Sequence, residues 1–114
     1  MDLKLNFYKQ LGSIVKPEAV FASNTSSLPI TNMGLASGRP ERFVGLHFFN
    51  PVQLMKLLEI VRTEHTSSAV FDAMAQFGKM INKTTVDCKD TPGFIVNRLL
   101  VPYIAQVLNH VIMC

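Results

Sequence analysis

Cysteine and charge are both scarce in this sequence, and their scarcity excludes several classes of protein. The 114 residues contain two cysteines, Cys88 and Cys114, which are too few for a disulfide framework and lack the spacing of a metal-binding pair. Two free thiols in a reducing compartment are expected instead. Charged residues make up 17% of the chain, and the net charge of +3 is scattered rather than gathered into a basic stripe. We therefore expect no nucleic-acid partner.

Long uninterrupted apolar runs and targeting features are also lacking. The most apolar stretch, residues 93–114, is interrupted by Asn97, Arg98 and His110, so no membrane span is expected. The N-terminal residues have neither an apolar signal core nor an Arg/Ser-rich transit character. Hydrophobic residues nevertheless make up 48% of the chain, which is typical of one packed globular domain.

Hydrophobic periodicity predicts helices alternating with strands. We expect helices over residues 2–15, 28–35, 67–81 and from about 90 onward, and strands over 19–22, 43–49, 57–61 and 84–88. The second and third strands are too close for a crossover helix and should be antiparallel, whereas a helix separates the third and fourth, which should be parallel. This alternation predicts an α/β fold with its ligands at the carboxyl ends of strands.

A histidine and a glutamate lie in two apolar segments that should pair. His47 lies within F-V-G-L-H-F-F, and Glu59 lies within L-L-E-I-V, where an ionised carboxylate is costly unless it is paired. If the two residues face each other, the turn centres on residue 53 and the loop has an ordinary hairpin length. The carboxylate would then fix the tautomer of the imidazole and raise its basicity, as a general base requires. Spacing alone equally allows a purely structural ion pair.

Three further polar residues could converge on this pair, and each also has a structural explanation. Asn50 follows the histidine strand and precedes a proline, as turn residues do. Ser26 lies in a polar loop after the first strand, where a hydroxyl can serve as a cap. Asn97 lies amid apolar helix residues, where an amide usually has a partner. The sequence alone leaves both explanations open for each residue.

Two other chemistries have little support. A hydrolase triad of Ser26, His47 and Glu59 would lack the G-x-S-x-G elbow that presents a nucleophilic serine. The three histidines, His47, His65 and His110, lack a recognisable metal-ligand spacing. We expect no metal site.

Four long segments resemble L-3-hydroxyacyl-coenzyme A dehydrogenase, in the same order and at the same spacing. They are A-S-N-T-S-S-L (22–28), R-F-V-G-L-H-F-F-N-P-V (42–52), M-K-L-L-E-I-V (55–61) and C-K-D-T-P-G-F-I-V-N-R-L-L (88–100). The resemblance covers almost the whole chain and weakens after about residue 105. Hydroxybutyryl-coenzyme A dehydrogenases and lens λ-crystallin share this pattern and remain candidate relatives.

This resemblance implies a reaction and a catalytic pair. His47 would be the general base of the G-L-H-F-F-N-P motif, and Glu59 would orient and polarise it. L-3-hydroxyacyl-CoA would be oxidised to 3-oxoacyl-CoA in fatty-acid β-oxidation, with NAD as the cofactor. His47 would take the hydroxyl proton while hydride leaves the same carbon.

The same resemblance implies roles for the surrounding polar residues. Ser26 would contact both substrate and cofactor, and Asn50 would line the reacting centre as a catalytic residue. Asn97 would help to hold the substrate carbonyl, and Lys4 would contact the cofactor. For Lys4, the residue pattern by itself indicates only a solvated helix charge.

The sequence departs from the family pattern at both ends. The 114 residues contain no G-x-G-x-x-G turn and no acidic ribose-binding residue at the corresponding place. We therefore expect residues 1–90 to be the C-terminal half of a Rossmann-like dinucleotide-binding domain. Residues 91–114 would begin the all-α dimerisation domain.

The resemblance further implies an acyl-CoA substrate, a homodimer for the full-length family and the mitochondrial matrix as the compartment. Because the glycine-rich turn is missing, we expect these residues alone neither to bind NAD normally nor to turn over. The alternative is a non-catalytic module that binds acyl-CoA or a full-length partner. An apolar face on the final helix would favour an interaction of this kind.

Overall fold

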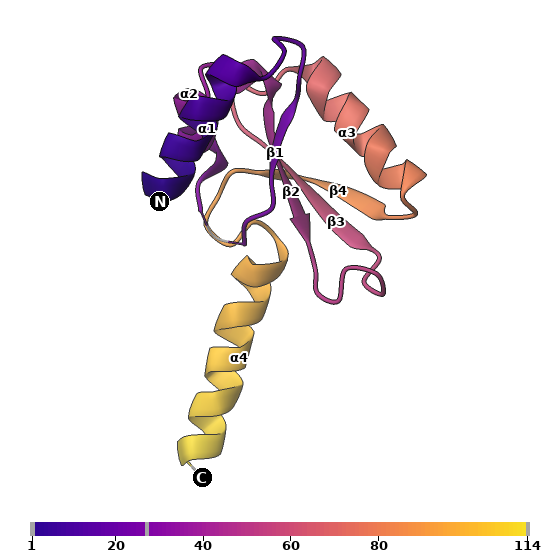
Figure 1. Ribbon diagram of the computed structural model, residues 1–114. Helices are drawn as coiled ribbons and strands as arrows, with labels where there is room; N and C mark the ends of the chain where they lie inside the picture. Colours follow the sequence, from indigo (N-terminus) through magenta and orange to yellow (C-terminus); the bar gives the residue numbers. More distant parts are fainter. Residues whose placement is uncertain (1, 27, 114) are drawn as a thin grey trace.

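The computed structural model describes residues 2–26 and 28–113, which form a mixed four-stranded sheet with flanking helices (Figure 1). The strands are β1 (Phe21–Ser23), β2 (Phe43–Phe48), β3 (Leu57–Arg62) and β4 (Thr84–Lys89), in the order β1-β2-β3-β4. β2 is parallel to β1 and antiparallel to β3, and β4 is parallel to β3. The expected α/β class and both expected strand directions are confirmed. Ser27, in the expected polar loop, and Cys114 lie outside the described residues.

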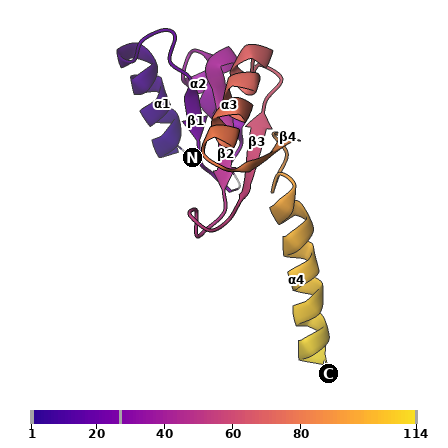
Figure 2. The same ribbon diagram turned by 90° about the vertical axis from the view of Figure 1, so that its right-hand side faces the viewer.

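Helices cover both faces of the sheet, as Figures 1 and 2 show. They are α1 (Asp2–Ile14), α2 (Ile30–Ala36), the short 3-10 helix η1 (Pro40–Arg42), α3 (Ser68–Met80) and α4 (Val96–Met113). One buried cluster packs α1 and α2 on the sheet through Tyr8, Met33 and Phe43. A second buried cluster packs α3 on the sheet through Val44 and Leu58. Burial on both faces explains why β2 and β3 are continuous apolar runs.

The alternation of side chains along these strands places the histidine and the glutamate on one face. Phe43 of β2 and Val61 of β3 both belong to the cluster under α1 and α2. His47 follows Phe43 by four residues and Glu59 precedes Val61 by two, so both side chains point to the same face. The sheet register pairs His47 directly with Glu59. The expected hairpin geometry is therefore confirmed.

Most of the predicted boundaries agree with the structure, and two differ in an informative way. β1 begins at Phe21, two residues later than predicted, and ends at Ser23, the first residue of the expected polar loop. α4 begins at Val96 rather than near residue 90, because Gly93 and Phe94 adopt left-handed φ angles of 77° and 50° and form a turn before the helix. The N-cap of α3 is Ser67, whose hydroxyl accepts a hydrogen bond from the backbone N–H of Val70.

α4 projects away from the body of the molecule (Figures 1 and 2) and gives it a long axis of 57 Å against 32 and 24 Å. Every described residue from Arg98 to Met113 is exposed, including large apolar side chains such as Leu108 and Val111. Among the described residues, no helix combines the length and the hydropathy that crossing a membrane requires.

Candidate active site

The buried pair of His47 and Glu59 is the centre of the candidate site. His47 is 3% exposed and Glu59 is 0% exposed, and 2.6 Å separates His47 Nδ1 from Glu59 Oε2. Because a carboxylate oxygen only accepts, Nδ1 carries the proton and donates it to Glu59. In the neutral imidazole the other ring nitrogen, Nε2, is then a hydrogen-bond acceptor, which is the state that a general base needs.

The second oxygen of Glu59 accepts from the start of the final helix. The backbone N–H groups of Ile95 and Val96 lie 3.0 and 2.8 Å from Oε1. Both carboxylate oxygens are therefore bonded, and the helix N-terminus adds a favourable partial positive charge. These contacts explain how β3 accommodates a fully buried carboxylate.

Ser26 contacts the open nitrogen of the imidazole. β1 and β2 are parallel, so the loop after β1 reaches the same edge of the sheet as His47. The Ser26 hydroxyl lies 3.1 Å from Nε2, and the Ser26 side chain is exposed. Asn97 extends this chain of contacts, because its side-chain N–H donates to the Ser26 carbonyl oxygen over 3.4 Å. The structure thus joins Ser26, His47, Glu59 and Asn97.

Among the described residues, no hydrogen bond joins Asn50 or Lys4 to this cluster. Asn50 is exposed in the hairpin after β2, where a cis peptide bond links it to Pro51, so its position agrees with the turn explanation. Lys4 lies half-buried on the first turn of α1. Catalytic and cofactor roles for these two residues stay predictions that follow from the resemblance.

Several contacts around the histidine were not predicted from the sequence. The Asn24 side chain accepts a hydrogen bond from the Phe48 backbone N–H over 3.2 Å, which ties the Ser26 loop to β2. Two aromatic rings also contact the imidazole: the centroid of Phe49 lies 4.6 Å from that of His47, and the centroid of Phe94 lies 5.5 Å from it. The F-F doublet after the histidine was a signal for the first ring. Nothing local indicated the second, which comes from the turn before α4.

An open, largely apolar groove of about 430 Å³ lies beside the network. It runs between the Ser26 loop and the first turns of α4, and its lining residues are Ser26, Pro92, Gly93, Asn97, Arg98, Val101 and Pro102. A mostly apolar lining with a few polar side chains, such as Ser26 and Asn97, suits a ligand with a polar reacting group and a hydrocarbon tail.

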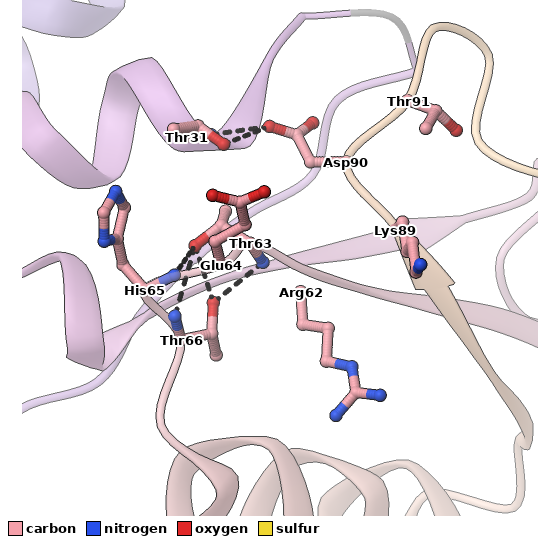
Figure 3. Close-up of a pocket in the computed structure, with 9 residues that line it drawn as sticks. All are labelled: Thr31, Arg62, Thr63, Glu64, His65, Thr66, Lys89, Asp90 and Thr91. Carbon is pink, nitrogen blue, oxygen red and sulfur yellow. Dashed lines mark hydrogen bonds between the residues drawn. The ribbon is translucent and has the colours of Figure 1, made fainter.

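A separate polar hollow of about 520 Å³ lies where β3 and β4 end (Figure 3). Its lining residues are Thr31, Arg62, Thr63, Glu64, His65, Thr66, Lys89, Asp90 and Thr91. Asp90 accepts from the backbone N–H and the hydroxyl of Thr31, and the hydroxyls of Thr63 and Thr66 are 3.1 Å apart. These bonds hold loops together, so the hollow has a structural explanation. Among the described residues there is no cluster of three or more side chains that could hold a metal ion.

Comparison with known proteins gives consistent relatives. A family model described as "3-hydroxyacyl-CoA dehydrogenase, NAD binding domain" matches residues 1–91. The chain is 50% identical over 109 residues to the mitochondrial hydroxyacyl-coenzyme A dehydrogenase of Rattus norvegicus, covering 96% of this chain and 35% of that protein. It is 47% identical over 113 residues to a probable 3-hydroxybutyryl-CoA dehydrogenase of Deinococcus radiodurans, covering 99% and 39%. The crystal structure of the (S)-3-hydroxybutyryl-CoA dehydrogenase of Ralstonia eutropha matches with a TM-score of 0.92 and 40% identity, covering 98% and 41%.

The fold and these relatives together define part of a Rossmann-like dinucleotide-binding domain of an oxidoreductase. The matched family model covers residues 1–91 and specifies the family of oxidoreductases. The chain belongs to the 3-hydroxyacyl-CoA dehydrogenase family, and NAD is the cofactor that the matched domain binds. It spans between 35% and 41% of the length of the relatives compared above.

The residues present fit one end of an NAD molecule. Ser26 offers an exposed hydroxyl beside the imidazole, at the carboxyl edge of β1 and β2, where a dinucleotide lies in folds of this kind. The 114 residues contain no glycine-rich turn to receive the pyrophosphate. Their fit is therefore to a part of the dinucleotide other than its pyrophosphate.

Proposed function

We propose that this chain carries the catalytic part of an enzyme that oxidises L-3-hydroxyacyl-CoA to 3-oxoacyl-CoA with NAD, in fatty-acid β-oxidation. The observation that carries the proposal is the buried pair, in which Glu59 holds Nδ1 of His47 and leaves Nε2 facing Ser26 over 3.1 Å. An imidazole fixed in this way is suited to remove a hydroxyl proton.

The proposed step assigns a role to each side chain of the network. The substrate hydroxyl displaces the Ser26 hydroxyl as the partner of Nε2 and gives its proton to His47. The chemistry that NAD would supply here is acceptance of the hydride from the carbon that bears this hydroxyl. Asn97 and Ser26 position the substrate, and Glu59 stabilises the imidazolium that forms. A matched base supplies roughly 10²–10⁴-fold of the rate.

The roles of Asn50 and Lys4 belong to the same proposal. Asn50 is exposed two residues after the end of β2, and its assignment to the reacting centre rests on the resemblance of the H-F-F-N-P segment. Lys4, on the first turn of α1, supplies a positive charge for an anionic cofactor. The homodimer and the mitochondrial matrix are proposed by analogy with relatives, one of which has "mitochondrial" in its name.

We further propose that the 114 residues alone bind acyl-CoA in the groove but do not catalyse the reaction, because they contain no glycine-rich turn to bind the pyrophosphate of NAD. Calorimetric titration with acetoacetyl-CoA, with and without NADH, tests the binding. Asn97→Ala should weaken it about three- to tenfold, as expected for one lost hydrogen bond. Asn109→Ala, a matched change on the exposed part of α4, should leave it unchanged.

The matching activity assay follows NADH consumption with acetoacetyl-CoA as the substrate. Turnover by the 114 residues at the level of the full-length family would refute the proposed incompetence. Acyl-CoA binding without turnover, and without any effect of Asn97→Ala, would favour the alternative of a non-catalytic acyl-CoA-binding module. The exposed apolar side chains of α4 favour a further alternative, a module that binds a full-length partner.

A further inference from the structure

Phe94 has an unusual backbone conformation for a large side chain. Its φ angle is 50°, in the left-handed region, and its ring is 3% exposed. Bulky residues rarely adopt this conformation, because the Cβ atom crowds the backbone. Such a conformation persists only where the surrounding structure imposes it, and it is found most often at functional sites.

The conformation of Phe94 directs its backbone and its ring toward the catalytic pair. Gly93 precedes it with a φ of 77°, and the two left-handed residues reverse the chain before α4. The next two backbone N–H groups, of Ile95 and Val96, then donate to Glu59. The ring of Phe94 lies against His47, with 5.5 Å between centroids and 60° between planes.

The plane of the His47 imidazole is set by rotation about its Cβ–Cγ bond. The contacts of Nδ1 with Glu59 and of Nε2 with Ser26 restrain this rotation, and in the proposed reaction the second contact is lost when substrate replaces the Ser26 hydroxyl. Aromatic contacts restrict the rotation further, since ring pairs favour particular offset or edge-on arrangements. Phe49 supplies one such contact at 4.6 Å, and Phe94 supplies the other from a distant part of the chain.

We propose that Phe94 is a positioning residue: its ring fixes the plane of the His47 imidazole, so that Nε2 stays directed at the position of the substrate hydroxyl. This inference rests on the proposed function, because it treats His47 as the base. Phe94 acts through His47 and needs no contact with substrate.

The test measures the order of the His47 ring by NMR, in the 114-residue chain and without any ligand. In the wild type we expect nuclear Overhauser contacts between the Phe94 and His47 rings, a ring-current displacement of the His47 ring protons, and restricted ring motion. Phe94→Leu should keep the buried apolar contact but lose the displacement and increase the motion. Phe94→Tyr, which retains the ring, should restore both. Phe77→Leu removes a ring that is 40% exposed on α3 and serves as the matched control.

A folded Phe94→Leu protein with unchanged His47 ring motion and unchanged shifts would overturn the proposal and leave Phe94 as an apolar filler. If Phe94→Leu does not fold, the wild-type measurement decides, because absence of contacts between the two rings would also overturn it. Acyl-CoA titration of the wild type reports on the proposed function separately. If the wild type does not bind acyl-CoA but its His47 ring is ordered by Phe94, the proposed function fails while the positioning of His47 by Phe94 stands.

Discussion

At the scale of single residues, the site depends on Glu59, a carboxylate without solvent exposure whose oxygens accept three hydrogen bonds. A buried charge of this kind is tolerated only because each oxygen is bonded. The pairing of Glu59 with His47 could be predicted from the sequence, because two apolar strands joined by a short hairpin have few registers. The contact with Phe94 could not, because it depends on a left-handed non-glycine residue.

Removal of the Glu59 carboxylate should destabilise the protein far more than removal of an exposed one. Glu59→Ala leaves His47 and two backbone N–H groups without their partner, and should cost about 3–5 kcal/mol. Asp87→Ala breaks an ion pair with Arg62 whose side chains are 41% and 45% exposed, and should cost less than about 1 kcal/mol. Guanidinium unfolding of both variants measures the difference. Equal losses would show that Glu59 is not held as described.

The thiol of Cys88 should be unreactive in the folded protein. Burial first, and then the nearby carboxylates of Glu59, Asp87 and Asp90, raise the pKa of Cys88 to about 12. In a Cys114→Ser variant, labelling by a disulfide reagent at pH 8 should be slow in buffer and fast in denaturant. Equal rates would contradict the burial of Cys88.

The raised pKa of Cys88 also has a consequence for stability. The unfolded chain loses the thiol proton near its ordinary pKa of about 9, whereas the folded chain keeps it until about 12. The contribution of the neutral thiol is therefore complete below pH 9 and is lost as the pH rises from about 9 toward 12. Cys88→Ala should flatten this part of the stability profile.

At the scale of elements, the turn between β4 and α4 organises the site. It supplies the amides that bind Glu59, the ring of Phe94 and the groove beside Ser26. Asp90, at the start of the turn, also caps the N-terminus of α2. The N-cap residue of that helix, Pro29, makes no side-chain hydrogen bond, and the Asp90 carboxylate accepts from the Ile30 backbone N–H instead. The sequence predicted both helices. It could not predict that Asp90 caps α2, because Asp90 lies 60 positions along the chain from Ile30 and local sequence patterns do not reveal such long-range contacts.

Asp90→Ala should loosen α2. The change removes three bonds to Ile30 and Thr31, of 3.0, 2.8 and 2.7 Å, and should cost about 1–3 kcal/mol. Asp72→Ala, at an exposed position of α3, is the matched control and should have little effect. Hydrogen exchange should show faster exchange in α2 for Asp90→Ala, with α3 unchanged. Uniform exchange changes across the protein would argue against a local cap.

At the scale of the whole molecule, two parts differ in how they are supported. The sheet and its helices bury two apolar clusters, whereas α4 extends into solvent. The antiparallel pairing of β2 with β3, the parallel direction of β3 and β4, and most element boundaries were predictable from apolar periodicity and loop length. The start of α4 was not, since the D-T-P-G segment is typical of a helix start and gives no sign of the extra turn formed at Phe94.

The exposed apolar surface of α4 should make the chain associate at high concentration. Leu108 and Val111 are 54% and 70% exposed, and replacing both by Lys should keep the chain monomeric. Met80→Lys, on α3, where the wild-type side chain is 83% exposed, should not reduce association. Light scattering over a concentration series distinguishes these results. Association that persists in the α4 variant would place the contact elsewhere.

The central claim is that Glu59 holds the Nδ1 proton of His47 and leaves Nε2 free to accept a proton from substrate. Nitrogen-15 NMR of the histidine rings in slightly alkaline buffer measures it directly, during titration with acetoacetyl-CoA. The account predicts a protonated Nδ1 and an unprotonated Nε2 for His47, with the Nε2 signal moving on addition of ligand while the signals of His65 and His110 stay in place. A His47 ring protonated at Nε2, or an Nε2 signal unmoved by bound acyl-CoA, would contradict it.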